Sequence, residues 1–467
     1  MDPFQSAADI ARAVRTGEYS SVQATRHCLE RIARLDERLH AFVSVDTEAA
    51  LAQARAADEL LRAGFPLGPL HGVPVAIKDL VDVQGQRAGA GSAAWRERVA
   101  SETATVARRL RDAHMVVVGR TQMVEFAFGG WGTNPLMGTP RNPWGGAAHR
   151  VPGGSSSGSG VAVAAGLVPA ALGSDTGGSV RLPAALNGIT GLKTTYGAVP
   201  LRGVFPLSTT LDSVGPMARS ARDCELMMQV MAGPDPDDPT TLNLPRFVAD
   251  DGEHASVAGM RIGLMPPEDY PLPADPATQA ALDDAVRVLR DAGATITPMR
   301  IGFDLDALMR RTGRIIAAEA FAIHRDYIDD ETLAIGPHVR RRVQGGRDIG
   351  VPDYLALLAE RTAERARFAS RMRDVDALLL PTVPFPARTI DEVDEQATPY
   401  GAFTRWGNYL GACGLSVPTG FDADGLPLAM QILGKPFDDA VVLRIGKAFQ
   451  RATDWHARTP ALEAAKV

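Results

Sequence analysis

Glycine and serine are concentrated between Pro152 and Pro183 in a pattern that could support nucleophilic chemistry. This segment contains two loops, Gly153–Gly160 and Gly173–Ser179, separated by a small-residue apolar stretch. Glycines let a backbone approach a ligand closely and direct several N–H groups at one point. The apolar stretch argues against a flexible linker, and the absence of G-x-x-x-x-G-K-[ST] and G-x-G-x-x-G argues against nucleotide binding. The pattern favours an oxyanion hole beside a nucleophilic serine.

A competing interpretation places the nucleophile at Ser156. Gly154 to Gly158 matches the G-x-S-x-G elbow of α/β-hydrolases, which needs a strongly apolar strand just before it and a later histidine. The preceding residues, GGAAHRVPG, do not predict such a strand. Candidates among the later histidines, such as His324, His338 and His456, lie in helical or terminal segments. We therefore expect a base other than histidine.

Lys78 is a candidate for that base. It follows the apolar, strand-like run from Gly72 to Ile77. A lysine can accept a proton at neutral pH if burial lowers its pKa from about 10.4 toward 7–8. A lysine at the end of a strand usually reaches solvent, so position alone does not make Lys78 catalytic.

Three segments resemble the defining motifs of the amidase signature family. They are GVPVAIKD at 72–79, PGGSSSGSG at 152–160 and GSDTGGSVRLPA at 173–184, and shorter matches extend the resemblance over nearly the whole chain. The resemblance implies Ser179 as nucleophile, Ser155 as a bridging serine on a cis peptide, and Lys78 as base. These groups would relay a proton while an acyl-enzyme forms and water hydrolyses it.

The resemblance also assigns roles around this triad. Asp175 and Arg181 are implied to hold the nucleophile loop, and no metal or cofactor is implied. The oxyanion hole would be formed by the backbone N–H groups of Thr176, Gly177, Gly178 and Ser179. The residues implied to contact substrate are Gly129, Gly130 and Leu182.

The elements that must position these residues alternate between helices and short strands. Ser20 and Gln23 form a capping-box pattern at the start of one helix, a strand is expected at 72–77, and helix–strand units are expected at 106–118 and 275–297. This alternation predicts an α/β fold in which helices cover both sides of a mixed β-sheet.

We expect residues 1–467 to form a single amidase domain with four consecutive parts. These are N-terminal helices (1–60), a core with the catalytic residues (61–231), a polar surface linker (232–256), and the second half of the sheet with substrate-pocket helices (257–467).

The composition of the chain argues against nucleic acids and membranes as partners. The formal net charge is −6 and no stretch of Lys and Arg forms a stripe, so we expect no nucleic-acid binding. The longest apolar run, Val161–Leu172, is too short to cross a bilayer, and the N-terminus lacks the apolar core of a signal peptide. Three widely spaced cysteines, Cys28, Cys224 and Cys413, are expected to be buried. We predict a cytoplasmic protein with no membrane partner.

The substrate is expected to be a small or aryl amide, including carbamoyl compounds. Leu182 lies where the family's pocket wall would be, and an apolar residue there favours a neutral acyl group. We favour an independent hydrolase over the glutamine-hydrolysing subunit of a tRNA-dependent amidotransferase, and over a non-catalytic or esterase-like serine hydrolase. A homodimer is left open. Five residues between 300 and 410 could line a pocket, although each is more typical of a surface or packing position. They are Arg311, Arg314, Tyr327, Arg340 and Trp406.

Overall fold

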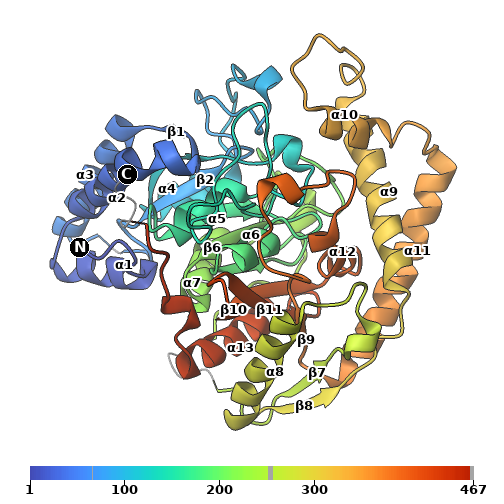
Figure 1. The fold of residues 1–467 in the computed structure, drawn as a ribbon. Helices are drawn as coiled ribbons and strands as arrows, with labels where there is room; N and C mark the ends of the chain where they lie inside the picture. The colour runs from blue at the N-terminus through green and yellow to red at the C-terminus, as the bar shows by residue number, and fades with distance from the viewer. Residues whose placement is uncertain (66, 251–255, 463–467) are drawn as a thin grey trace.

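The computed structural model describes residues 1–65, 67–250 and 256–462. Within these ranges an 11-stranded mixed sheet runs through the molecule with helices packed against it (Figure 1), which confirms the predicted α/β fold. The strands are β1 Phe42–Val45, β2 Pro74–Lys78, β3 Val116–Thr121, β4 Ala170–Ser174, β5 Thr190–Lys193, β6 Val214–Ala218, β7 Arg261–Leu264, β8 Thr295–Pro298, β9 Ala377–Pro381, β10 Cys413–Phe421 and β11 Pro427–Gly434.

Helices flank this sheet along the whole chain. Their bounds are α1 Ala7–Thr16, α2 Ser21–Leu39, α3 Thr47–Arg62, α4 Thr105–Asp112, α5 Ser157–Ala164, α6 Arg181–Leu186, α7 Ala221–Met231, α8 Pro276–Asp291, α9 Leu305–His324, α10 Pro337–Gln344, α11 Val351–Arg371, α12 Arg405–Tyr409 and α13 Asp439–Ala452.

The order of the strands divides the sheet into two halves that follow the chain. The order is β1-β3-β2-β4-β6-β5-β10-β11-β9-β7-β8, so strands that precede residue 232 lie on one side and strands that follow it lie on the other. The halves join where β5 pairs with β10 in an antiparallel manner, with Lys193 opposite Gly414 and Gly191 opposite Ser416. One continuous sheet therefore carries residues from both halves.

Local sequence rules account for several helix ends. The Ser20 side chain accepts from the Gln23 N–H, and Gln23 accepts from the Ser20 N–H, which is the predicted capping box of α2. Asp275 caps α8 with Pro276 in its first turn, as the sequence indicates. Gly293, just past the end of α8, adopts φ 96°, a conformation that favours glycine.

The segment predicted as a surface linker begins as an attached turn. Arg109 of α4 donates hydrogen bonds to the carbonyls of Met231, Gly233 and Pro234, and the Thr105 hydroxyl contacts Asp235. The first part of 232–256 is therefore fixed to α4, because these contacts use the polar backbone that a linker would leave to solvent. Residues 251–255 lie outside the described residues.

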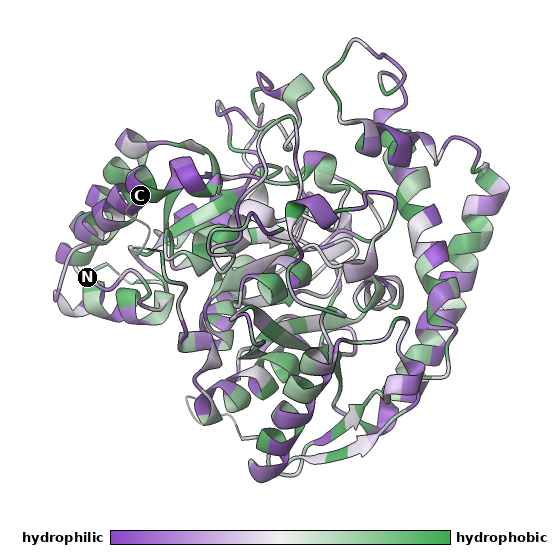
Figure 2. Cartoon of the chain, in the orientation of Figure 1, coloured by the Kyte–Doolittle hydropathy of each residue, from purple (hydrophilic) through white to green (hydrophobic). Residues whose placement is uncertain are grey.

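The core lies around the central strands. Every residue of β2, β4, β5 and β6 is buried, and the three cysteines are buried and free as predicted. Apolar residues line the inner faces of the helices while polar residues dominate the outer surfaces (Figure 2). Among the described helices, none combines the length and the apolar character needed to cross a membrane.

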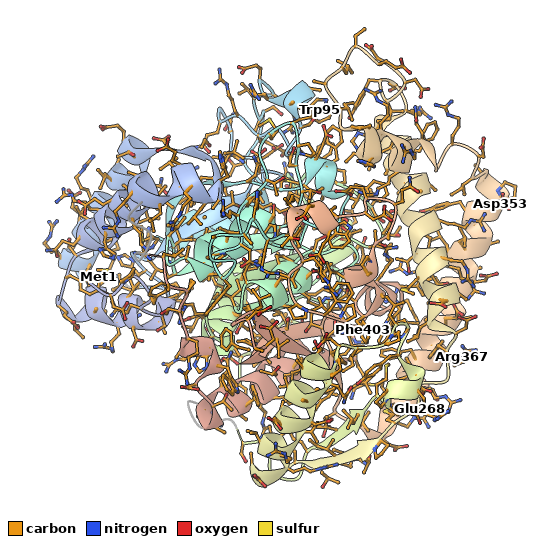
Figure 3. The ribbon with its side chains drawn as sticks, in the orientation of Figure 1. Met1, Trp95, Glu268, Asp353, Arg367 and Phe403 are labelled. Atoms are coloured by element: carbon orange, nitrogen blue, oxygen red, sulfur yellow. The ribbon has the colours of Figure 1, made fainter. Side chains whose placement is uncertain are left out.

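The long helices α9 and α11 pack together at the edge of the molecule. Arg311 of α9 forms ion pairs of 2.8 Å with Glu360 and Glu364 of α11. Asp353 on α11 lies at the periphery, whereas Phe403 is fully buried nearer the centre (Figure 3). The 300–410 region is largely helical, in agreement with the sequence.

Candidate active site

Two parallel strands bring Lys78 and the nucleophile loop to one edge of the sheet. β2 ends on Lys78, and β4, which pairs with β2 in parallel through Ala76 and Ala171, ends on Ser174. The carboxyl ends of neighbouring parallel strands lie at the same edge, where α/β proteins commonly place their sites. The 173–179 loop, which starts as β4 ends, is thereby brought beside Lys78.

Lys78 is surrounded by serine hydroxyls. Its Nζ donates to the Oγ atoms of Ser155 at 2.7 Å, Ser174 at 2.8 Å and Ser156 at 3.0 Å. Its side chain is fully buried. Burial lowers the pKa of Lys78 to about 7, although the carboxylates of Asp212 and Asp175 act in the opposite direction. A substantial neutral fraction, able to accept a proton, is therefore present near neutral pH.

Ser155 and Ser156 lie immediately before helix α5. The Gly154–Ser155 peptide bond is cis, and α5 begins at Ser157. Ser156 is fully buried, and its Oγ both accepts from Lys78 and donates to the Ser174 carbonyl at 3.2 Å. The elbow interpretation needs a strand directly before Ser156, but the nearest preceding strand, β3, ends at Thr121. The local structure therefore does not match that motif.

The Ser179 side chain lies at the surface of the site. Ser179 is 8% exposed, in contrast to the fully buried Ser155 and Ser156. Its carbonyl accepts from the Ser156 N–H at 3.2 Å, which joins the two loops. No hydrogen bond of the Ser179 hydroxyl is found within the described ranges. Ser179 therefore keeps a small exposed fraction, whereas Ser155 and Ser156 have none.

The loop before Ser179 contains the N–H groups that the resemblance assigns to an oxyanion hole. The Gly178 N–H donates to Asp175 Oδ1 at 2.7 Å, so in this structure it is directed into the loop. No such contact occupies the N–H groups of Thr176, Gly177 and Ser179 among the described residues. Gly178 has φ 129°, and a Cβ there would collide with the Thr404 hydroxyl, so only glycine fits.

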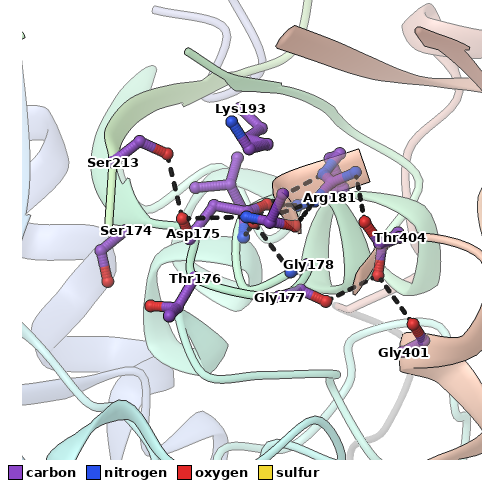
Figure 4. Close-up of polar contacts among 12 residues, drawn as sticks. Ser174, Asp175, Thr176, Gly177, Gly178, Arg181, Lys193, Ser213, Gly401 and Thr404 are labelled. Atoms are coloured by element: carbon purple, nitrogen blue, oxygen red, sulfur yellow. Dashed lines mark hydrogen bonds and ion pairs between the residues drawn. The ribbon is translucent and has the colours of Figure 1, made fainter. Parts of the chain in front are cut away.

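A buried ion pair holds this loop in place (Figure 4). Arg181 donates to both carboxylate oxygens of Asp175 at 3.0 Å, and both side chains are fully buried. Burial by itself would raise the pKa of Asp175, but the Arg181 guanidinium lowers it well below its usual range. Arg181 also donates to Gln431 and Asn408 at 2.5 Å. The loop is thus tied to the second half of the sheet, as expected for structural positions.

A second carboxylate lies on the Lys78 side. The Thr176 hydroxyl donates to Asp212 at 2.5 Å, and the N–H groups of Leu207 and Ser208 donate to the other oxygen. Burial raises the pKa of Asp212 to about 6, against these hydrogen bonds. Asp212 therefore orients Thr176 and supplies part of the negative potential at Lys78.

Comparison with known proteins identifies the family. The amidase family model matches residues 23–443. This chain belongs to the amidase family. A glutamyl-tRNA(Gln) amidotransferase subunit from Chloroflexus aggregans is 40% identical, over 96% of each chain.

Solved structures show the same fold for this amidase. One similar structure belongs to a vestigial protein complex that reveals the evolutionary origins of an s-triazine catabolic enzyme. It superposes with a TM-score of 0.88 at 31% identity, and the match covers 96% of this chain and 98% of that chain. The peptide amidase from Stenotrophomonas maltophilia superposes with a TM-score of 0.84 at 30% identity, and the match covers 98% of this chain and 99% of the peptide amidase.

The residues expected to contact substrate lie together in this amidase. A Cβ on Gly130 would lie 3.5 Å from the Leu182 side chain, and one on Gly129 would lie 3.2 Å from an Arg342 nitrogen. Leu182 is 2% exposed and belongs to an apolar cluster with Trp131 and Tyr400. The Gly130 backbone therefore lies beside the Leu182 side chain, and contact of these residues with substrate stays a prediction.

The pocket candidates from 300–410 are mostly engaged elsewhere in the amidase fold. Arg311 pairs with α11, Tyr327 contacts His324, and Arg340 donates to backbone carbonyls. Arg314 is exposed and Trp406 is fully buried. These placements agree with the surface and packing roles that the sequence favours.

Sequence reasoning missed three residues of this site and considered a fourth, Ser156, only as a competing nucleophile. Ser156 and Ser174 bind Lys78, while Arg342 and Arg405 lie beside the glycines at 129 and 177. Ser174 could have been found as the residue that ends the strand parallel to β2. No local pattern identifies the two arginines, because their neighbours come from distant parts of the chain.

Proposed function

We propose that this amidase hydrolyses the C–N bond of a small carboxamide through an acyl-enzyme on Ser179. The observation that carries the proposal is the buried Lys78, with a pKa near 7, hydrogen-bonded to Ser155 at 2.7 Å. A neutral amine in this position is a general base for a serine relay, and no histidine takes that place among the described neighbours of the loop.

The reaction follows from these groups. Ser179 Oγ attacks the amide carbonyl while its proton passes through Ser155 to Lys78, and N–H groups of the 176–179 loop stabilise the oxyanion. The proton returns to the nitrogen as the C–N bond breaks, so ammonia or an amine leaves. Water then attacks the ester on Ser179 with the same base, which releases a carboxylic acid and restores the serine.

Covalent labelling tests the nucleophile. We expect a fluorophosphonate to modify Ser179 and no other serine, as located by peptide mass spectrometry, and Ser179→Ala to abolish turnover and labelling. Ser157→Ala is a matched control, because the Ser157 hydroxyl is buried without a hydrogen-bond partner among the described residues. A label on Ser156 would instead support the elbow and overturn this mechanism.

A second candidate function concerns the substrate class. The similarity to a glutamyl-tRNA(Gln) amidotransferase subunit over nearly its whole length supports glutamine as substrate more strongly than the independent hydrolase that we favoured from sequence. The TM-score of 0.84 to a peptide amidase supports the wider class. Both substrates would use the same Ser179 chemistry.

Kinetics distinguish the two candidates. We would measure kcat/KM of the purified chain for glutamine and for benzamide, by ammonia release, alone and with the remaining amidotransferase subunits added. Higher kcat/KM for glutamine, or activity that appears only with those subunits, supports the amidotransferase role. Faster hydrolysis of benzamide by the chain alone supports the independent hydrolase. Ser179→Ala reports background ammonia in each assay.

A further inference from the structure

Arg405 lies directly against the nucleophile loop. It opens α12, and a Cβ on Gly177 would lie 3.5 Å from its Cγ and 3.6 Å from its Nε. The preceding residue, Thr404, donates its hydroxyl to the Gly177 carbonyl at 2.8 Å (Figure 4). The Arg405 side chain is therefore fixed beside the loop that ends in Ser179, two residues further along.

Among the residues that the structure describes, no carboxylate forms an ion pair with Arg405. Arg181 pairs with Asp175, and Arg342 pairs with Glu395 at 2.8 Å. The Arg405 guanidinium donates instead to the neutral Thr398 hydroxyl at 3.2 Å, and its Nε is buried without a hydrogen-bond partner among the described residues. An unpaired cation and an unused buried donor are both unfavourable until an acceptor binds.

The surroundings strengthen the case for an anion. Burial, together with the nearby positive charge of Arg342, lowers the pKa of Arg405 to about 10. Arginine stays protonated at neutral pH, so the site keeps its positive charge during turnover. A guanidinium offers a planar set of N–H donors whose geometry matches a carboxylate.

We propose that Arg405 binds a carboxylate of the substrate beside the nucleophile loop, so that the enzyme prefers amides that carry a negative charge. This inference rests on the proposed Ser179 chemistry and narrows its substrate class. It departs from the neutral acyl group that Leu182 alone suggests, because the cation at Gly177 comes from a segment more than 200 residues away in the chain.

Matched amide pairs test the preference. On the acyl side, succinamate and glutaramate are compared with butyramide and valeramide; on the leaving side, N-acetylglycine is compared with N-ethylacetamide. We expect kcat/KM to favour the anionic member of at least one pair by about tenfold or more. Arg405→Gln should lower that ratio by about 10- to 100-fold, mainly through KM. Arg405→Lys, which keeps the charge without the planar fork, should lie between them.

Controls separate the sources of failure. Arg388→Gln removes an exposed arginine that pairs with Glu392, and it should leave the ratio unchanged. Fluorophosphonate labelling of Ser179 in each variant reports an intact site. If wild type labels and hydrolyses amides with no preference for anionic members, the Arg405 assignment is wrong while the Ser179 mechanism stands. If Ser179 does not label, the mechanism itself fails.

Discussion

At the scale of single residues, we expect Lys78 to determine how activity depends on pH. Its buried side chain has a pKa near 7 and accepts a proton only when neutral. We expect kcat/KM to rise with pH to a plateau, with a midpoint near 7, because the deprotonated fraction of Lys78 grows over that range. Lys78→Ala should reduce the rate by at least about 10²–10⁴-fold. A midpoint above 9 would contradict the assignment of Lys78 as the base.

The same burial links Lys78 to stability. The pKa is about 7 when folded, compared with about 10.4 when unfolded. Between these values the unfolded state binds more protons, so the free energy of unfolding rises with pH. Relative to Lys78→Met, wild type should gain about 1.4 kcal/mol per pH unit between pH 7 and 10. Urea denaturation of both proteins measures this difference, and parallel pH dependence would disprove the linkage.

The residues assigned to the triad could be selected from the sequence because each lies in a short motif. The fold brings Lys78, at the end of β2, within 2.7 Å of the Ser155 hydroxyl, and a hydrogen bond from the Ser156 N–H to the Ser179 carbonyl joins the two serine loops. Arg405 could not be found from a motif, because the proposed role depends on the absence of a carboxylate beside its guanidinium. A buried arginine without a carboxylate partner can be recognised only from the tertiary structure, because its neighbours come from several distant segments of the chain.

At the scale of elements, the Asp175–Arg181 pair fastens the nucleophile loop to α6. Asp175→Asn keeps the shape of the side chain but leaves the buried Arg181 with neutral partners alone, among them Asn408 and Gln431. Breaking a buried pair from one side typically costs about 3–5 kcal/mol. We expect a loss of that size in the free energy of unfolding, measured by urea denaturation.

An exposed aspartate provides the control for that variant. Asp326 makes a 3.5 Å contact with Arg325 on the surface, with its side chain 88% exposed. Asp326→Asn should change stability by less than about 1 kcal/mol, because solvent screens such pairs. Equal losses in the two variants would mean that the buried pair does not hold the loop.

Helix ends and strands of the fold could be predicted because their causes are local. Ser20 with Gln23, and Asp275 with Pro276, define helix starts through contacts within one turn. The attachment of Gly233, Pro234 and Asp235 to α4 was missed, since a polar, Pro-rich composition does not indicate contacts with a distant residue such as Arg109.

At the scale of the whole molecule, the continuous sheet predicts cooperative unfolding. β5 and β10 join the halves, and Arg181 reaches Gln431 across the join. We expect the loss of helical circular dichroism and the loss of Ser179 labelling to coincide in one urea transition. Two separated transitions would show that the halves unfold independently.

The span of the Arg181 contacts has a consequence for biosynthesis. The side chain meets Asn408 and Gln431, which follow it by 227 and 250 residues. At about 5–20 residues per second, translation takes roughly 10–50 s to supply these partners after the nucleophile loop is made. We therefore expect a growing chain to contain Lys78, Ser155 and Ser179 before Ser179 can react. Ribosome-stalled chains ending near residue 400 should resist fluorophosphonate, whereas released full-length chains should label.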